Sequence, residues 1–189
     1  TVRPVNPFLL LPLYWGCKLL FLLRGVRVKS VNKVGHQPEQ PSIILCNHGS
    51  FIDFLFAETL LLKVRPRFVV ARLYFYHKFV GWLLRQLGCF PKSMFALDLE
   101  STKNCLRVLK EGRVLAMMPE ARLSTAGTFE DIQDGTFPFL KKTGVPVYTV
   151  KLKGDYLSNP KWGKGFRRGS VVEAELDLLF TPEELQTLS

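Results

Sequence analysis

The stretch Ser42-Ile43-Ile44-Leu45-Cys46-Asn47-His48-Gly49-Ser50-Phe51-Ile52-Asp53 joins a short apolar run to a polar loop. The run at 42–46 has the length and the continuous apolar character of a strand that is buried on both faces. Ser50 followed three residues later by Asp53 has the pattern of a helix cap, which predicts that a helix begins there. The stretch therefore predicts a strand, a loop and a helix in succession, the unit from which α/β sheets are built.

The same alternation of short apolar runs and helical patterns continues along the chain. Further strands are predicted at 68–71, 114–118, 145–152 and 171–179. Helices are predicted at 52–63, 74–87, 102–111 and 137–143, and the last two are followed by Gly112 and Gly144. A final helix is expected to begin at Thr181, with Glu184 closing a capping box. The fold class that we expect is α/β, with a mostly parallel sheet covered by helices on both faces.

Composition restricts the class of protein and the kind of partner. The 189 residues carry 26 Lys and Arg against 16 Asp and Glu, a net charge of +10, and 47% of them are hydrophobic. This hydrophobic content excludes intrinsic disorder, no repeat is visible, and the length suits one domain. A basic chain binds nucleic acid, anionic membranes or phosphorylated small molecules. The apolar excess favours membranes and phosphorylated molecules over nucleic acid.

A membrane-associating helical segment is predicted at the N-terminus. Residues 8–23 read FLLLPLYWGCKLLFLL and are followed by basic residues. These 16 residues are fewer than the roughly 20 needed to span a bilayer, so we expect an interfacial or re-entrant anchor. The expected division is a membrane-associating segment at 1–25 and a single domain at 26–189. The alternative for the apolar run is a buried core helix of the same length.

Two further features of the sequence indicate which residues are buried and in which compartment the protein lies. The segment 68–90 predicts an aromatic-rich amphipathic helix, and we expect its apolar residues to face the core. The four cysteines contain no CxxC pair and have mainly apolar neighbours, which argues against a disulfide framework or a zinc site and predicts a reducing compartment. With the N-terminal segment, this favours a membrane-associated protein that faces the cytoplasm.

The loop after the first strand contains the strongest candidates for chemistry, His48 and Asp53. Loops at the carboxyl ends of strands are where α/β sheets bind ligands. A side chain in a first helical turn leans toward the N-terminus, so the Asp53 carboxylate, kept ionised by the helix dipole, can reach the imidazole. An Asp that holds one ring nitrogen leaves the other nitrogen as a base for a substrate hydroxyl. The alternative is that Asp53 only caps the helix and that His48 is an ordinary loop residue.

The block Asn47-His48-Gly49-Ser50-Phe51-Ile52-Asp53 resembles the Asn-His-x-(Ser/x)-x-x-Asp hallmark of the glycerolipid (1-acyl-glycerol-phosphate type) acyltransferase family. The resemblance covers residues 26–153. It implies that His48 is the general base, that Asp53 orients it, and that an acceptor hydroxyl attacks an acyl thioester without an acyl-enzyme. It also implies acyl-CoA or an acyl carrier protein as co-substrate and no resident cofactor.

A second block, Pro119-Glu120-Ala121-Arg122-Leu123-Ser124, is similar to the family's Pro-Glu-Gly-Thr-Arg-Ser. Its arginine stands one position early, and Leu123 occupies the usual arginine place. The resemblance implies that Arg122 binds the acceptor's phosphate, because a guanidinium offers a fork for phosphate oxygens. It further implies that Glu120 positions the acceptor or Arg122, and that Ser124, which falls in register, belongs to the substrate-binding set.

A third block, at 88–94, resembles the family's Gly-x-Phe-Pro-x-x-Arg but has Met94 at the arginine position. Lys92 is the nearest cation and is the candidate phosphate-binding residue there, although a lysine cannot form the bidentate fork of an arginine. A last block at 145–150 has Thr149 where the family has a second proline. Acceptor recognition is therefore expected to differ from that of a standard lysophosphatidate enzyme.

These observations predict transfer of a fatty acyl group from acyl-CoA or acyl-carrier protein to the hydroxyl of a lysophospholipid such as 1-acyl-glycerol-3-phosphate. The expected partners are membrane lipids and these substrates, and not nucleic acid. No metal site is expected, because His36 and His77 are isolated from other ligands. Two alternatives stay open: a non-catalytic membrane lipid-binding protein that retains the fold, and a nucleic-acid-binding domain. The basic segment 161–168 either contacts lipid headgroups or donor phosphates, or forms a solvated hairpin tip.

Overall fold

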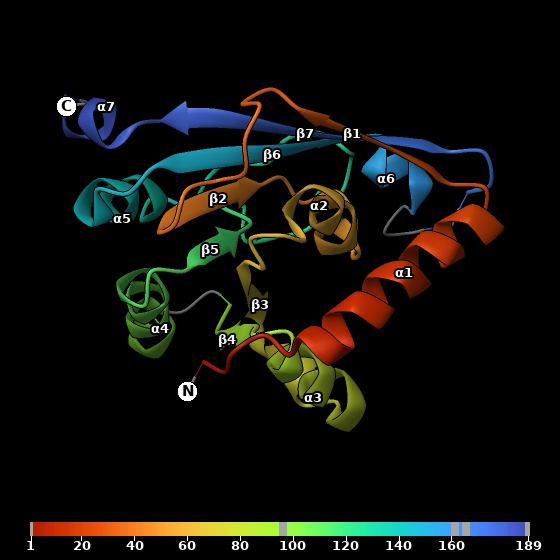
Figure 1. Ribbon diagram of the computed structural model, residues 1–189, viewed down its shortest axis with the longest axis horizontal. Helices are drawn as coiled ribbons and strands as arrows, with labels where there is room; N and C mark the ends of the chain where they lie inside the picture. Colours follow the sequence, from red (N-terminus) through yellow and green to blue (C-terminus); the bar gives the residue numbers. More distant parts are fainter. Residues whose placement is uncertain (1, 95–97, 160–162, 164–166, 188–189) are drawn as a thin grey trace.

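The computed structural model describes residues 2–94, 98–159, 163 and 167–187, and within them a seven-stranded sheet forms the centre of the molecule (Figure 1). The strands are β1 Arg27–Asn32, β2 Ser42–Cys46, β3 Arg67–Ala71, β4 Phe90–Lys92, β5 Val114–Met117, β6 Val147–Lys153 and β7 Val171–Phe180. Their order across the sheet is β1-β7-β6-β2-β5-β3-β4. Neighbouring strands are parallel except β6 and β7, which are antiparallel. The predicted α/β fold with a mostly parallel sheet is confirmed.

Helices pack on the two faces of this sheet. They are α1 Pro7–Leu23, α2 Asp53–Leu61, the 3-10 helix η1 Arg72–Phe75, α3 Lys78–Gln86, α4 Leu99–Lys110, α5 Thr136–Thr143, α6 Asp155–Ser158 and α7 Pro182–Thr187. Strand β2 is buried along its whole length, and its side chains alternate between two hydrophobic clusters. Ile44 and Cys46 join a cluster that includes α1 and α2, whereas Ile43 and Leu45 join one that includes α4 and α5. The continuous apolar run thus serves both faces, as expected for a central parallel strand.

The predicted single helix at 74–87 is wrong. The chain forms η1 first and then α3, whose N-cap His77 accepts a hydrogen bond from the Val80 backbone N–H at 3.3 Å. A local side-chain cap therefore starts a new helix where the apolar pattern alone suggested continuity. Strands β1 and β4 and helix α6 were not predicted. β1 is an edge strand with mostly exposed side chains, β4 has three residues and α6 has four, so they lack a readable hydrophobic period.

The expectation that the apolar residues of 68–90 face the core is wrong for part of that segment. Phe75 and Leu84 are buried, but the outer side of η1 and α3 exposes apolar and aromatic residues to solvent. These exposed residues are Leu73, Tyr74, Tyr76, Phe79 and Trp82. The buried residues of α3 are Gly81 and Leu84, and Gly81 packs directly against the backbone of Phe75 in η1.

The C-terminal expectation is confirmed. The Thr181 backbone N–H donates to Glu184 Oε2 at 2.8 Å, and the Glu184 N–H donates to Thr181 Oγ1 at 3.3 Å, which is a capping box. The late strand predicted at 171–179 is β7. Of the basic segment 161–168, all but Gly163, Arg167 and Arg168 lie outside the described residues.

Helix α1 has two apolar sides with different surroundings. On one side Leu10 and Phe21 are buried, and the Phe21 ring stacks on Phe56 of α2 with the ring centroids 4.9 Å apart. On the other side Phe8 and Trp15 are 87% and 63% exposed. In the part of the chain that the structure describes, no helix combines the length and the apolar character needed to cross a bilayer. α1 is thus partly the core helix of the alternative interpretation, and it also leaves an apolar side uncovered.

Replacing Phe21 should separate these two sides by their effect on stability. Phe21→Ala removes a buried ring from the contact with Phe56, so the free energy of unfolding should fall by about 3–5 kcal/mol. Phe8→Ala on the exposed side should change it by less than about 0.5 kcal/mol. Urea unfolding followed by circular dichroism measures both. Equal effects of the two substitutions would show that α1 does not pack on α2.

Candidate active site

The loop between β2 and α2 brings His48 and Asp53 into contact. His48 Nδ1 donates to Asp53 Oδ2 at 2.9 Å, and the Ser50 backbone N–H donates to the same oxygen at 2.9 Å. The predicted reach of the Asp53 carboxylate to the imidazole is thus confirmed as a contact. The predicted cap at Ser50 is wrong, because α2 begins at Asp53 with Ile52 as its N-cap. Residues 50–53 form a tight turn ahead of the helix, closed by a 3.3 Å bond from the Asp53 N–H to the Ser50 carbonyl.

The electrostatics of this contact follow from its burial. The Asp53 side chain is fully buried, while the His48 side chain is 25% exposed. Burial raises the pKa of Asp53, and the hydrogen bonds from His48 and Ser50 act in the opposite direction by favouring the carboxylate. Asp53 also stands in the first turn of α2, where the helix dipole favours a negative charge. With Nδ1 held by Asp53, the second ring nitrogen of His48, Nε2, is left to act on a ligand.

Asn47 ties this loop to strand β6. Its Nδ2 donates to the Leu152 carbonyl at 3.1 Å, and its Oδ1 accepts from the Leu152 N–H at 2.7 Å. The side-chain amide therefore bonds to both polar backbone groups of one residue, as a neighbouring strand would. No role for Asn47 was predicted from the sequence, where it was only the first letter of the block.

The loop after β5 lies against the backbone of His48 and bonds to it. Glu120 is buried, burial raises its pKa, and the nearby backbone N–H groups of His48 and Glu130 act in the opposite direction. The Ser124 N–H donates to the His48 carbonyl at 2.7 Å. The Ser124 hydroxyl is engaged within its own turn, donating to Thr128 and accepting from Gly127. Glu120 and Ser124 therefore hold the His48 loop in place, whatever they contribute to substrate binding.

The predicted phosphate-binding cations are not gathered around His48. Arg122 follows β5, is half exposed and pairs with Glu130 at 2.6 Å between Nη2 and Oε2. Lys92 ends β4, which is separated from β2 by β5 and β3, a spacing of roughly 14 Å at three strand separations. Lys153 is a cation that sequence reasoning missed, and it stands at the end of β6, next to β2. Its place directly after the predicted strand 145–152 was the available signal.

A cleft beside His48 gathers polar groups from three strand ends. Its space is about 850 Å³, open solvent included. The lining residues that carry polar side chains relevant to chemistry are Asn47, His48, Glu120, Lys153, Asp155 and Tyr156. Arg122, Ser124 and Lys92 are not in its lining. Asp155 was not predicted, and it is buried at the start of α6.

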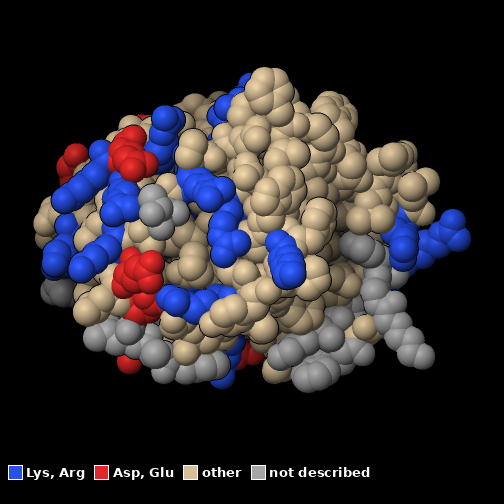
Figure 2. Space-filling model, turned by 90° about the horizontal axis from the view of Figure 1, so that it is seen from below, with Lys and Arg blue, Asp and Glu red and all other residues tan. Residues whose placement is uncertain are grey.

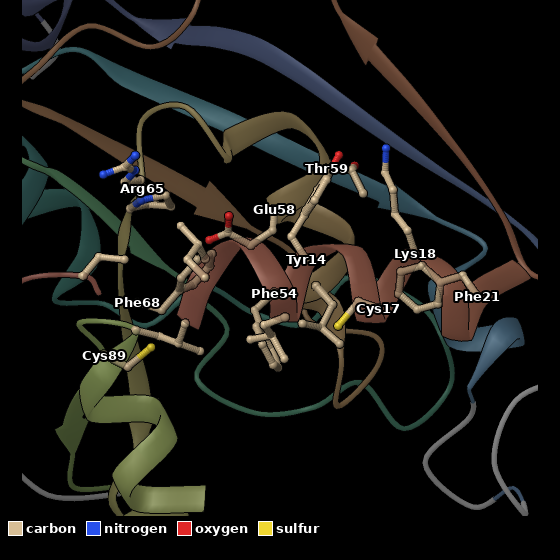
Figure 3. A pocket seen from close by; sticks show the side chains of 16 residues that line it. Tyr14, Cys17, Lys18, Phe21, Phe54, Glu58, Thr59, Arg65, Phe68 and Cys89 are labelled. Atoms are coloured by element: carbon tan, nitrogen blue, oxygen red, sulfur yellow. The ribbon is translucent and has the colours of Figure 1, made fainter. Parts of the chain in front are cut away.

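A second cavity lies between α1 and α2 and is mostly apolar (Figure 3). Tyr14, Cys17 and Phe21 line it from α1, and Phe54 and Glu58 line it from α2. Burial raises the pKa of Glu58 to about 7. The lining of this cavity includes residues of α2, whereas the lining of the His48 cleft comes from the loops after β2 and β5, from the end of β6 and from α6. Among the described residues, no group of three or more His, Cys, Asp or Glu side chains could hold a metal ion.

A buried Asp in contact with a His at the carboxyl edge of a mostly parallel sheet, beside a polar cleft, defines a class of α/β domain with a candidate site at a strand end. Within that class, this chain belongs to the Acyltransferase family, whose family model matches residues 26–153. The resemblance inferred from the sequence motifs is thereby confirmed, and it covers the same residues, 26–153.

Similar proteins carry related names. The chain is 28% identical over 130 residues to a chloroplastic 1-acyl-sn-glycerol-3-phosphate acyltransferase of Brassica napus, which covers 67% of this chain and 37% of that protein. It is 26% identical over 157 residues to the 1-acyl-sn-glycerol-3-phosphate acyltransferase of Bacillus subtilis, covering 82% of this chain and 74% of that protein. The chain thus spans little more than a third of the plant relative.

The fold is similar to a crystal structure of the 1-acyl-sn-glycerophosphate acyltransferase PlsC from Thermotoga maritima. The TM-score is 0.74 at 21% sequence identity, and the match covers 94% of this chain and 71% of PlsC. At this identity the likeness bears on the fold alone.

Proposed function

We propose that this chain transfers an acyl group from a thioester of coenzyme A or acyl carrier protein to the hydroxyl of a lysophospholipid such as 1-acyl-glycerol-3-phosphate. The observation that carries the proposal is the 2.9 Å contact between His48 Nδ1 and the buried Asp53 carboxylate at a polar cleft. The names of the relatives from Brassica napus and Bacillus subtilis support the same reaction.

In the proposed reaction, His48 Nε2 takes the proton of the acceptor hydroxyl as its oxygen attacks the thioester carbonyl carbon. The carbon–oxygen bond forms, the tetrahedral intermediate collapses, and the carbon–sulfur bond breaks. His48 then returns the proton to the departing thiolate, so no acyl-enzyme is formed. Asp53 accepts the Nδ1–H throughout, which fixes the tautomer and stabilises the imidazolium.

The acceptor's phosphate is proposed to bind Arg122, with Lys153 as a second cation in the cleft wall. The ion pair with Glu130 uses one end of the Arg122 guanidinium, which has five N–H donors in total. Lys92 remains the candidate at the far end of the same sheet edge. The apolar cavity between α1 and α2 has a lining suited to hydrocarbon, which the substrates of such a reaction carry.

Substitution of the pair tests the mechanism. His48→Ala should lower the rate of acyl transfer from acyl-CoA to lysophosphatidate by about 10²–10⁴, because the general base is lost. Asp53→Asn should also lower it strongly, since an amide cannot stabilise the imidazolium and favours the wrong tautomer. Turnover of a labelled donor, with melting temperatures as a check on folding, measures both. A folded His48→Ala protein with wild-type turnover would contradict the mechanism.

The same assay separates the enzyme from the non-catalytic lipid-binding alternative. If the wild-type protein binds lysophosphatidate yet gives no product with either donor, the lipid-binding function is favoured. Wild-type turnover that depends on His48 favours the acyltransferase.

The role of Arg122 is tested through the acceptor. Arg122→Lys keeps a point charge but loses the fork, so the apparent KM for lysophosphatidate should rise by a factor that corresponds to about 1–3 kcal/mol. The KM for the acyl donor and for a phosphate-free acceptor should change little. Arg107→Lys, at an exposed position on α4, is the matched control. If Lys153→Ala shows this pattern and Arg122→Lys does not, the phosphate lies in the cleft wall instead.

We further propose that the protein is membrane-associated and faces the cytoplasm, bound through a surface formed by α1, η1 and α3. The exposed apolar residues of this α1/α3 surface are Phe8, Leu11, Trp15, Leu19, Leu22, Leu73, Tyr76, Phe79 and Trp82. The start of α1 and the end of α3 are joined by a 2.8 Å hydrogen bond from the Asn6 N–H to the Gln86 carbonyl. Figure 2 views the molecule from below, where a broad area without charged side chains lies beside several Lys and Arg.

The residues of the α1/α3 surface favour contact with lipid over contact with water. α1 is apolar on both sides, and a helix that is apolar all round is normally covered all round. Trp15 and Tyr14 flank Lys18, whose Nζ lies 4.8 Å from the Tyr14 ring centroid, a mixture typical of the headgroup region.

Binding to vesicles tests the α1/α3 surface. The double variant Trp15→Ser/Phe79→Ser should bind phosphatidylglycerol vesicles at least about tenfold more weakly, since each aromatic ring contributes about 1.5–3 kcal/mol when it leaves water. Ile132→Ser removes an apolar residue of similar exposure outside the surface and should leave binding unchanged. Sedimentation with vesicles measures the affinity. Equal losses for both proteins would contradict a specific membrane surface.

A further inference from the structure

A second buried carboxyl, Asp155, lies next to Asp53. Asp155 is 4% exposed, stands at the start of α6 and lines the cleft that contains His48. Asp53 Oδ1 and Asp155 Oδ2 are both buried and have no hydrogen-bond donor among the described residues. Each carboxyl also affects the pKa of the other, so the two side chains lie close together, and a hydrogen bond between them would require a proton on one of them.

The chain places Asp155 there through several independent features. Gly154 has a φ of 81°, in the left-handed region that favours glycine, and it turns the chain from β6 into α6. The Asn47 amide holds Leu152 just ahead of this turn, and Asn159 Nδ2 donates to Ser50 Oγ at 3.4 Å just after it. A Cβ at Gly49 would collide with Asp155 Oδ2, so the loop after β2 has no room for a side chain at this point.

We propose that Asp155 is a positioning residue that carries a proton and donates a hydrogen bond to Asp53, so that Asp53 is held from both oxygens while it orients His48. The inference rests on the proposed function. In this arrangement, His48 and Ser50 donate to Asp53 Oδ2, and Asp155 satisfies the oxygen that has no other donor. The carboxylate then has little freedom to turn away from the imidazole.

The electrostatics identify Asp155 as the partner that keeps the proton. Two carboxylates in contact repel each other, so only one of them is ionised. Asp53 has the two N–H donors that favour a charge, whereas burial and the negative charge of Asp53 raise the pKa of Asp155 to about 7. Asp155 is therefore neutral below about pH 7, and its hydrogen bond to Asp53 is lost as the pH rises through that value.

Other titratable groups surround the pair without supplying its missing donor. They are the Cys46 thiol at the end of β2, His48 on the following loop, and Glu120 after β5. Lys153 of β6 lines the same cleft and pairs with Glu173 and Glu175 of β7 at 3.6 and 3.8 Å. Burial and the nearby carboxyls raise the pKa of Cys46 well above its usual value, so that thiol stays neutral.

Infrared difference spectroscopy tests the shared proton without reference to activity. Because Glu58 also has a pKa raised to about 7, the test compares two proteins, and the Glu58 band cancels in the difference. The spectrum of the wild type minus that of Asp155→Asn should contain the C=O stretch of a neutral carboxylic acid that disappears with a midpoint near pH 7, and the spectrum of the wild type minus that of Asp134→Asn, which alters an exposed carboxyl, should not. A wild-type minus Asp155→Asn spectrum without this band would overturn the proposal.

Kinetics test the positioning role. Asp155→Asn retains a donor toward Asp53, so kcat should stay near that of the wild type and should lose the decline above about pH 7. Asp155→Ala has no donor and should lower kcat by about 10-fold to 100-fold, the loss typical when a supporting hydrogen bond to an active residue is removed. KM for donor and acceptor should change little in both.

Gly49→Ala provides a second variant, because its Cβ displaces Asp155 while the carboxyl is kept, and it should lower kcat as Asp155→Ala does. If Asp155→Ala and Asp155→Asn have the same kcat and pH profile as the wild type, the positioning role is wrong. If the infrared band behaves as expected but no variant, wild type included, transfers an acyl group, the carboxyl pair stands and the proposed function fails.

Discussion

Burial of the Asp53 carboxyl is the constraint to which the surrounding loops conform. A carboxylate removed from water is costly unless donors surround it, and the side chain of Asp53 has no exposed surface. Donors reach it from the imidazole of His48 and from the backbone of Ser50, and the dipole of its own helix favours its charge. Each of these donors belongs to a loop or helix whose place the parallel sheet determines. The orientation of His48 is therefore a consequence of satisfying a buried charge.

Satisfying that charge also explains why the segments nearest the site bond to each other's backbone. Asn47 bonds to Leu152, and the Ser124 N–H bonds to the His48 carbonyl. These contacts pair polar groups inside the fold. Each such group left without a partner would lower the stability of the fold by about 1–3 kcal/mol. The rigid part of the site is its backbone, and the cleft that opens beside it carries the groups able to meet a substrate.

The central sheet and the His48–Asp53 contact could be predicted because both depend on residues that are close together in the sequence. The run at 42–46 has the apolar character of a buried strand. The spacing of five residues between His48 and Asp53 places the histidine in the loop just ahead of the helix whose first turn contains the aspartate. Asp155 could not be predicted, because it approaches Asp53 only through the sheet order that sets β6 beside β2. The distance of Lys92 from His48 could not be predicted for the same reason, since sequence order does not show the strands that separate β4 from β2.

The ties between the loop after β2 and the end of β6 join residues far apart in the chain. Asn47 and Leu152 are separated by 105 residues, and Ser50 and Asn159 by 109. Contacts of such long range form late, because a large loop must close before they contribute any free energy. A chain still emerging from the ribosome can form β2 and the start of α2, but it completes the surroundings of Asp53 only after residue 159 has been made. Competence of the site is thus a late event in folding, and it reports that the parallel sheet has assembled in its native order.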